Sequence, residues 1–270
     1  MKHKKLIMIT VILSPIIVLL MYRTCIFNSL EGKLLFVEDT TSQIMQYDLS
    51  NKELSEVHFS NIQLIEIIGE SKNGDYCIVD NKKDLYLVNG DKATKKATLS
   101  VNPDSIFVSD NYVYYSYYSD IYSMDINNDI TKKIIKSVDN NTEFTLFDNQ
   151  IFFIRDSTLY AYDLTTLSIS EICPAAYGLT TNVKSNEVFF VCEDTYLHSY
   201  NTKSGKEKKH IKYRVGPPIT WSKNGKILFG NYSTELDTGN ILTGAVDRLI
   251  GFRKQIMFDE VYADNMIYIE

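Results

Sequence analysis

One pattern of turns and strands recurs along most of the 270-residue chain, at a spacing of 36 to 42 residues. In each unit a glycine or an asparagine precedes a short run of apolar residues. The seven turn residues are Gly32, Gly74, Asn111, Asn149, Asn186, Gly225 and Asn265. Glycine and asparagine adopt positive φ more readily than other residues, and tight hairpin turns require positive φ. Each unit is therefore predicted to contain a hairpin that leads into the apolar strand.

A second mark keeps the same period and follows the next strand of each unit. There an aspartate or an asparagine ends the strand and a polar turn begins, at Asp48, Asn89, Asp125, Asp163, Asn201 and Asp237. These side chains are expected to accept hydrogen bonds from their own downstream backbone and so to start the turn. The stretch Asp148–Asp163, DNQIFFIRDSTLYAYD, is the clearest copy. It is predicted to form the two middle strands of the fourth unit.

Two further strands complete each unit. Ser105–Val108, Glu143–Leu146 and Pro218–Trp221 precede the first turn of their units, and Lys95–Leu99 and Lys132–Ile135 follow the last. Four strands in about 38 residues is the strand number and repeat length typical of one β-propeller blade. Tyrosine and phenylalanine, 19 and 13 residues, suit such strands. The predicted fold class is all-β, a propeller of six blades, with seven blades and an incomplete last one as the alternative.

Closure of the ring follows from the strand count. The pattern yields 25 strands, one more than six four-stranded blades require. We expect Ile256–Val261 to supply the innermost strand of the first blade, because a closed ring removes the exposed edge that invites aggregation. This assignment leaves Met266–Ile269 as an extra strand or tail.

The first thirty residues differ in kind from the repeat. The uncharged run Leu6–Tyr22 is 17 residues long, the lower limit for spanning a bilayer, and no small-residue cleavage site follows it. The chain is divided into a basic cytoplasmic stub (1–5), a signal anchor or transmembrane helix (6–22), a linker (23–31) and the propeller (32–270). Because Lys2, Lys4 and Lys5 precede the apolar run, we expect the N-terminus to stay inside and the propeller to lie outside the cytoplasm. Secretion after signal cleavage is the alternative.

The charge beyond residue 23 constrains the partners. It comprises 24 basic and 34 acidic groups, a net charge of about −10. A nucleic-acid partner would require a basic surface, so none is expected.

The residues that usually carry chemistry are dispersed. Cys25, Cys77, Cys173 and Cys192 have no metal-like spacing, and the strand patterns around Cys77 and Cys192 predict small buried residues. The spacing of Cys173 and Cys192 does not decide whether the two form a disulfide outside the cell. The histidines fall in different units without a metal-binding motif, and neither a phosphate-binding loop nor a nucleophile elbow occurs. The acidic pairs Glu193–Asp194 and Asp259–Glu260 are interpreted as solvated. No cofactor, no metal and no catalytic residue are predicted.

Two features are candidates for ligand contact. The first is a tyrosine-rich strand, in which Tyr115, Tyr117 and Tyr118 could form an aromatic platform for a sugar or a peptide. Packing between neighbouring blades is the alternative explanation of the same tyrosines. The second is Arg214, which precedes an innermost strand and so belongs to the face where propellers usually bind ligands. An ordinary loop is its alternative.

Two segments carry a family resemblance. Thr220–Phe229, TWSKNGKILF, resembles the W-S-x-D-G-x-x-I-x-F text of TolB/WD40-like propeller repeats, with Asn224 where the family usually has aspartate. Leu159–Leu164 resembles the IYxxDL strand of those repeats. The region after the anchor also resembles the uncharacterised DUF5050-type propellers of Gram-positive bacteria. The resemblance implies a fold, and it carries over no catalytic residue.

Three functions remain open on the sequence. The favoured one is a membrane-anchored, extracytoplasmic propeller that binds a protein, peptide or glycan at the cell envelope without catalysis. The second is a propeller hydrolase or lyase, which would require polar residues from several blades to converge at the central channel. The third is a scaffold in a larger assembly, which would present a broad apolar outer patch.

Overall fold

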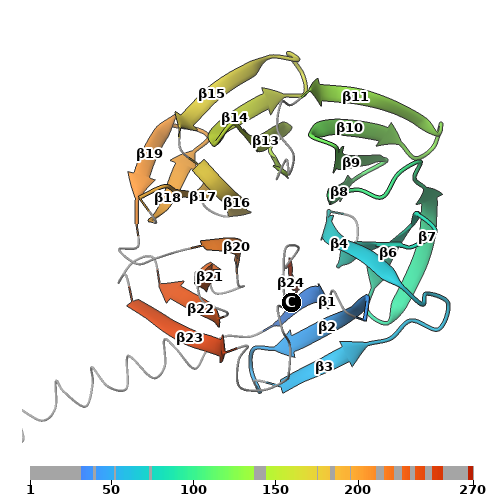
Figure 1. Cartoon of the computed structure of the whole chain (residues 1–270). Helices are drawn as coiled ribbons and strands as arrows, with labels where there is room; N and C mark the ends of the chain where they lie inside the picture. The colour runs from blue at the N-terminus through green and yellow to red at the C-terminus, as the bar shows by residue number, and fades with distance from the viewer. Residues whose placement is uncertain are drawn as a thin grey trace, which may run out of the picture.

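The structure is a computed structural model, and the chain folds as a closed ring of strands (Figure 1). The structure describes residues 32–38, 41–51, 53–72, 75–136, 144–174, 176–182, 186–194, 196–210, 216–221, 227–231, 235–240, 245–251 and 267–269. The predictions for residues 1–31, for Gly74, Gly225 and Asn265, for Arg214, and for Ile256–Val261 with Asp259–Glu260 lie outside these ranges. Among the residues described, no helix is long and apolar enough to cross a membrane.

Within these ranges 24 strands form six antiparallel blades of four. The first blade consists of β24 (Ile267–Ile269), β1 (Lys33–Glu38), β2 (Gln43–Asp48) and β3 (Glu53–Val57). The second has β4 (Ile65–Ser71), β5 (Tyr76–Asp80), β6 (Asp84–Asn89) and β7 (Lys92–Thr98). The third has β8 (Ser105–Ser109), β9 (Tyr112–Tyr117), β10 (Asp120–Asp125) and β11 (Ile130–Lys136).

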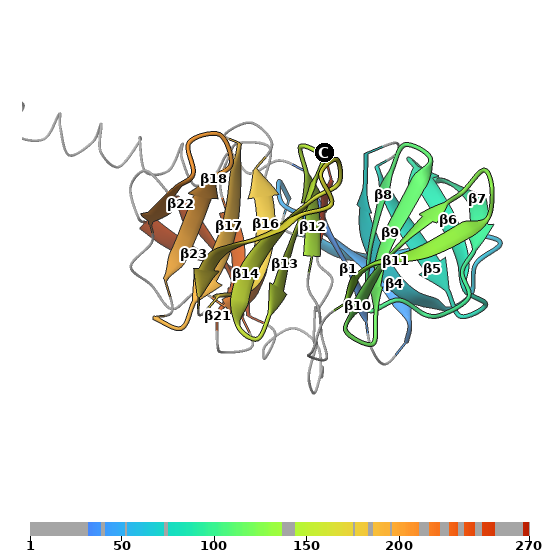
Figure 2. The same ribbon diagram turned by 90° about the horizontal axis from the view of Figure 1, so that it is seen from above.

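The other three blades follow in chain order. The fourth has β12 (Phe144–Phe147), β13 (Gln150–Arg155), β14 (Thr158–Asp163) and β15 (Ile169–Pro174). The fifth has β16 (Ala176–Asn182), β17 (Glu187–Cys192), β18 (Leu197–Asn201) and β19 (Lys206–Lys209). The sixth has β20 (Gly216–Trp221), β21 (Ile227–Asn231), β22 (Glu235–Asn240) and β23 (Ala245–Gly251). Each blade runs from the central axis outward, and Figure 2 shows the strands passing between the two faces of the ring.

The predicted hairpin of the fourth unit is confirmed. Asp148 and Asn149 connect β12 to β13 with φ of 46° and 64°, and Asp156 and Ser157 connect β13 to β14 with φ of 51° and 54°. Two successive residues with positive φ form the type I′ turn, whose twist matches that of paired strands. The stretch Asp148–Asp163 therefore builds the two middle strands of the fourth blade.

The second mark of the repeat is confirmed as a strand end at five positions, including Asn89 at the end of β6, and is wrong at one. The side chains of Asp48, Asp125, Asp163 and Asn201 each accept hydrogen bonds from two backbone N–H groups downstream, at 2.8–3.3 Å. These turns join the third and fourth strands of their blades. Asp237, in contrast, lies in the middle of β22, paired with Phe229 and Arg248. Its strand continues to Asn240 because the pairing with β23 continues to that residue.

The cores lie between blades. One cluster contains Val79 and Leu85 of the second blade with Val113 and Met124 of the third, and equivalent clusters join blades one and two, three and four, and four and five. A sheet held between two others is buried on both faces. This is why the second strands carry long apolar runs, as in β5, where Tyr76–Val79 are all buried together with the Asp80 that follows them.

Ring closure differs from the sequence prediction. The innermost strand of the first blade is β24, whose Ile267 pairs with Leu35 and whose Ile269 pairs with Lys33. The sequence assigned this position to Ile256–Val261 and left Met266–Ile269 as an extra strand or tail. In the sequence, a turn residue precedes the apolar run of β24, and this is the pattern by which second strands were predicted. Ile267 nevertheless packs in the core that joins the first two blades, with 5 % of its surface exposed.

Blades two and three form one continuous sheet of eight strands. Their innermost strands β4 and β8 form a short parallel pairing, Glu70 opposite Phe107 and Ser71 opposite Val108. Gly69 makes this approach possible. A Cβ atom at that position would lie 2.3 Å from the carbonyl oxygen of Ile106.

The outermost strands carry charge. β7, β11 and β19 each contain three lysines, and nearly all their side chains are exposed or partly exposed. Lysines on an edge strand oppose pairing with a second sheet. The broad apolar outer patch required by the scaffold hypothesis is therefore not present on these three strands.

Candidate functional site

The chain repeatedly returns to one face of the ring, here called the crossover face. It carries the connections from each blade to the next and the turns between second and third strands. Tyr117, Tyr118, Arg155, Cys192 and Asp194 belong to this face, because they lie in or beside those turns. The turns that follow the third strands lie on the opposite face.

Tyr118 is the most exposed large apolar side chain described, at 74 %. It occupies the turn between β9 and β10 with Ser119, with φ of 46° and 69°. Its ring meets that of Tyr117 edge-on, with 4.5 Å between the centroids. Its backbone N–H donates to Asp104 Oδ2 at 3.2 Å, so the loop that enters the third blade holds this turn. Desolvation and the neighbouring Tyr118 raise the pKa of Tyr117.

Tyr115, the third tyrosine of the predicted platform, is buried. Its side chain is 1 % exposed, lies in the core between blades two and three, and stacks on Tyr122 at 5.3 Å. Successive side chains of a strand point to opposite faces, so in a blade covered on both sides an aromatic ring in the middle of a strand is buried, and one at a strand end or in a turn can reach solvent. Of the three tyrosines predicted to form an aromatic platform, Tyr117 and Tyr118 lie beside or in a turn on the crossover face, and Tyr115 does not. Arg214, the other predicted contact, lies outside the described residues.

Arg155 occupies the equivalent turn of the fourth blade but has structural partners. Its guanidinium donates to the backbone carbonyl of Lys136 at 2.9 Å, and it lies 4.7 Å from the centre of the Tyr160 ring. Lys136 ends the last strand of the third blade. Arg155 therefore links the third and fourth blades.

The six innermost strands carry few ionisable side chains suited to acid–base catalysis. Within their described ranges the carboxylates are Glu66 and Glu70, and both belong to β4. Burial raises the pKa of the Glu70 carboxyl. Convergence of such groups from several blades, which the hydrolase or lyase hypothesis requires, does not occur on these strands.

A serine and a histidine meet in the fifth blade, a contact that the sequence did not predict. Ser199 Oγ lies 2.7 Å from His210 Nε2 and donates to Glu187 Oε1 at 3.2 Å. Burial, followed by the charge of Lys208, lowers the pKa of His210 to about 4. In a catalytic triad the acid holds the histidine, whereas Glu187 bonds to the serine itself. Ser199 is also 1 % exposed, so the group is a buried polar contact rather than a nucleophile.

Polar side chains and two thiols gather where the fourth and fifth blades meet. Cys173 Sγ, Cys192 Sγ and a carboxylate oxygen of Glu207 all lie within 4.8 Å of one another. Both cysteines are buried in the core between these blades. Desolvation and the charge of Glu207 raise the pKa of the Cys173 thiol to about 11, and desolvation also raises that of Cys192.

His198 connects this group to the crossover face. Its Nδ1 lies 2.7 Å from Glu207 Oε1 and its Nε2 lies 3.3 Å from Asp194 Oδ1. Lys209 Nζ donates to Asp194 Oδ2 at 2.5 Å and lies over the Tyr196 ring. Asp194 is thus ion-paired, not simply solvated as the sequence suggested. His198 and His210 also share the fifth blade, which corrects their assignment to different units.

Sequence reasoning missed the cluster because its members are far apart in the chain. Cys173 and Cys192 are separated by 19 positions and belong to different blades, and Glu207 stands among lysines on an outer strand. The burial of Cys77 and Cys192 was predicted correctly from their strand patterns. The sequence left a pairing of Cys173 with Cys192 open, and no local motif indicated that Glu207 would join them.

Comparison with known proteins supports the fold. No family model matches the chain, and no curated protein sequence matches it. Among solved structures, a chain of a nidogen–laminin complex has a TM-score of 0.65 and 10 % identity, covering 89 % of this chain and 99 % of that chain. The extracellular domain of a proposed one-component system from B. thetaiotaomicron has a TM-score of 0.55 and 13 % identity. That match covers 88 % of this chain and 35 % of the other.

The class of protein is therefore a β-propeller, closed from six four-stranded blades. Identities of 10 % and 13 % support the common fold and carry no function across. In all, 1037 solved chains match, which is expected of an architecture shared by proteins of many functions.

Proposed function

We propose that this chain is a membrane-anchored, extracytoplasmic propeller that binds a protein, peptide or glycan at the cell envelope without catalysis. The observation that carries the proposal is Tyr118, an exposed aromatic side chain held at positive φ on the crossover face.

Tyr118 is costly for the fold in two ways. A non-glycine residue in the left-handed region costs about 1–2 kcal/mol, and type I′ turns favour asparagine, aspartate or glycine. An exposed phenol ring also gains little from the packing of its own chain. Backbone strain concentrates at functional sites, so an unfavourable exposed aromatic residue supports a role in contact with a ligand. Tyr117 beside it enlarges the same apolar surface.

The location rests on the sequence and on structural likeness. Leu6–Tyr22 with its preceding lysines is the proposed anchor, and the positive charges favour an internal N-terminus. One structural neighbour is described as an extracellular domain, and another comes from a complex with laminin. Both descriptions fit a propeller that binds partners outside the cytoplasm.

Binding is tested by photo-crosslinking in intact cells. A photoreactive phenylalanine analogue is introduced at position 118, and at position 112 as the control. Tyr112 is also exposed, at 43 %, but it begins β9 at the opposite face. We expect a discrete adduct from position 118 alone, to be identified by mass spectrometry. Equal yields at both positions, or no adduct at either, would contradict the proposal.

The variant Tyr118→Asn separates binding from folding. We expect it to stabilise the protein by about 1 kcal/mol, because asparagine tolerates positive φ. It should also abolish capture of the crosslinked partner when the analogue is placed at position 117. The control Ser157→Gly relieves the equivalent turn of the fourth blade and should leave capture unchanged. A stabilised Tyr118→Asn that retains full capture would assign Tyr118 to the turn alone.

The anchor is tested separately by fractionation and N-terminal sequencing. We expect the chain in the membrane fraction, with residues 1–22 retained and the propeller digested by protease added to intact cells. A secreted product that begins near residue 25 would replace the anchor with a cleaved signal. Protection of the propeller from external protease would overturn the proposed orientation.

A further inference from the structure

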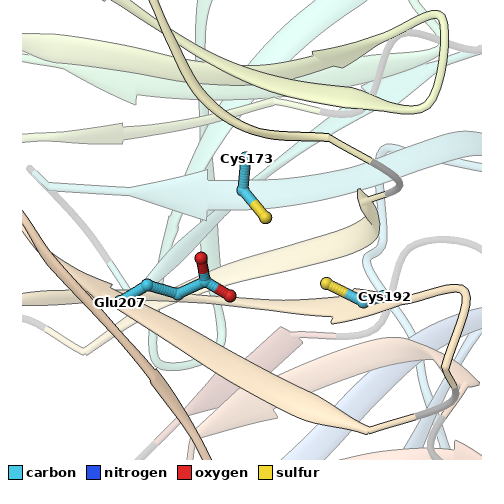
Figure 3. Close-up of side chains that lie close together, drawn as sticks. All are labelled: Cys173, Cys192 and Glu207. Atoms are coloured by element: carbon cyan, nitrogen blue, oxygen red, sulfur yellow. The ribbon is translucent and has the colours of Figure 1, made fainter.

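The junction of the fourth and fifth blades brings three potential metal ligands to one point. Cys173 is the residue before the last of β15 in the fourth blade, while Cys192 ends β17 and Glu207 lies on β19 of the fifth. Their ligand atoms lie within 4.8 Å of one another, and Figure 3 shows all three side chains directed toward a common space. The ligands therefore come from three strands and two blades.

We propose that Cys173, Cys192 and Glu207 form a site for a divalent zinc-type ion that clamps the fourth blade to the fifth. Zinc accepts thiolate sulfur at about 2.3 Å and carboxylate oxygen at about 2.0–2.2 Å in tetrahedral geometry. Ligand atoms around such an ion are therefore about 3.5–4 Å apart. The spread of up to 4.8 Å requires only small side-chain movements to reach that arrangement.

The ligand set also selects the class of ion. Two thiolates disfavour magnesium and calcium, which take oxygen ligands, and the carboxylate suits a divalent ion of intermediate softness. Three protein ligands leave a fourth position for water. Binding displaces one proton from each thiol to solvent, so the two thiolates and the carboxylate together carry three negative charges toward the ion.

The surroundings of Glu207 match those of a positioned ligand. His198 Nδ1 lies 2.7 Å from Glu207 Oε1 and so holds the carboxylate in place beside the two thiols. Asp194 contacts the far nitrogen of His198, and Lys209 in turn holds Asp194. Outer partners of this kind orient metal ligands, and their removal lowers the affinity for the metal. His198 is thus a positioning residue in the proposed site.

A disulfide between Cys173 and Cys192 is the competing use of the same sulfurs. It would also join the two blades, but it would make no use of Glu207 or of the histidine that orients it. The third donor favours the metal. The proposal is independent of the proposed function, because the cluster lies in the blade junction and does not include Tyr117 or Tyr118.

The test uses the full chain, purified in detergent with a phosphine reductant and titrated with Co²⁺ and then Zn²⁺. We expect one equivalent of Co²⁺ to produce a thiolate-to-cobalt charge-transfer band, which Zn²⁺ removes and Mg²⁺ does not. Saturating Zn²⁺ should raise Tm by roughly 5–10 °C at about 100 times Kd. Intact-mass measurement before reduction shows whether the two cysteines were oxidised.

The variants separate ligands from bystanders. Cys173→Ser and Cys192→Ser should remove the charge-transfer band or reduce its intensity by half, and Glu207→Gln should weaken Co²⁺ binding at least about tenfold. His198→Gln should retain the band with about 10–100-fold weaker binding, the signature of a positioning residue. Cys77→Ser is the control, because Cys77 is buried in another blade.

Two results would overturn the metal site. One is a reduced chain that gives no thiolate–cobalt band at one equivalent, or whose band keeps its full intensity in both cysteine variants. The other is a native chain recovered quantitatively with a Cys173–Cys192 disulfide, which would assign the sulfurs to a covalent link.

Discussion

His210 illustrates at the scale of one residue how burial sets a charge state. Its ring packs against Phe189, with 5.3 Å between the centroids, and its Nε2 meets Ser199. Burial opposes protonation, so the pKa falls from 6.5 in a free side chain to about 4. The unfolded chain therefore binds a proton at this residue between these pH values while the folded chain does not.

This difference predicts a stability loss in acid. Protonation of His210 in the unfolded chain costs no stability above pH 6.5. As the pH falls toward 4, it lowers the free energy of unfolding by an amount on the order of 2–3 kcal/mol. In His210→Gln that part of the pH dependence should disappear, while a side chain able to bond Ser199 remains. Denaturant unfolding at pH 7, 6, 5 and 4 measures the difference between variant and wild type.

His58→Gln is the matched control for this prediction. The His58 side chain is 71 % exposed beside Glu56, so its removal should leave the slope unchanged. Parallel curves for wild type and His210→Gln would refute the assigned role of His210.

At the scale of the element, blades depend on turns and on close approaches of backbone. The turns after β2, β10 and β14 are each started by an aspartate, and hydrogen bonds from the following residues lower the pKa of Asp48, Asp125 and Asp163. The sequence predicted these turns because their chemistry is local. The parallel contact between β4 and β8 was not predicted, since it joins residues in different blades.

Gly69→Ala tests that contact. The added Cβ would meet the carbonyl oxygen of Ile106 at 2.3 Å, and backbone cannot move aside as a flexible side chain can. We expect a loss of about 1–3 kcal/mol in the free energy of unfolding, the usual range for overpacking. Denaturant titration at neutral pH provides the measurement.

Gly90→Ala serves as the comparison. A Cβ at Gly90 meets nothing within 4 Å, and the substitution carries only the cost of φ at 56°. A Gly69→Ala protein within about 0.5 kcal/mol of wild type would show that β4 and β8 can separate without cost.

At the scale of the whole molecule, the ring depends on a strand of three residues. β24 covers the inner edge of β1 and brings Ile267 into the core shared by blades one and two. Without it the first blade would have an unpaired inner edge, and the closure that protects a propeller from edge-to-edge association would be lost.

Ile267→Asp should open this closure. A carboxylate at a position that is 5 % exposed has no partner, so we expect destabilisation of about 3 kcal/mol or more and increased self-association. Thermal unfolding and analytical ultracentrifugation report the two effects. Ile130→Asp, on the outer strand β11 at 50 % exposure, makes the same chemical change and should alter neither. Equal behaviour of the two variants would mean that β24 does not close the ring.

The sequence alone determined the all-β class, the period of the blades, the positions of most second strands and the residues that begin the turns. These features depend on neighbours in the chain: a turn residue acts on the next two or three backbone groups, and an apolar run records burial on both faces. For this reason they could be predicted from the sequence. Asp237 was wrongly predicted to end a strand, because pairing with β23 extends that strand to Asn240.

Only the tertiary structure decided which strand closes the ring, which tyrosines reach solvent, and which side chains meet between blades. β24 and a true second strand have the same local sequence pattern, a turn residue followed by an apolar run. Tyr115 and Tyr118 stand three positions apart in one tyrosine-rich segment, yet one is buried and the other exposed. Cys173, Cys192 and Glu207 have no common motif and meet because the ring stacks the fourth blade against the fifth. Contacts between blades depend on how the sheets twist and pack, and no local pattern in the chain records that geometry.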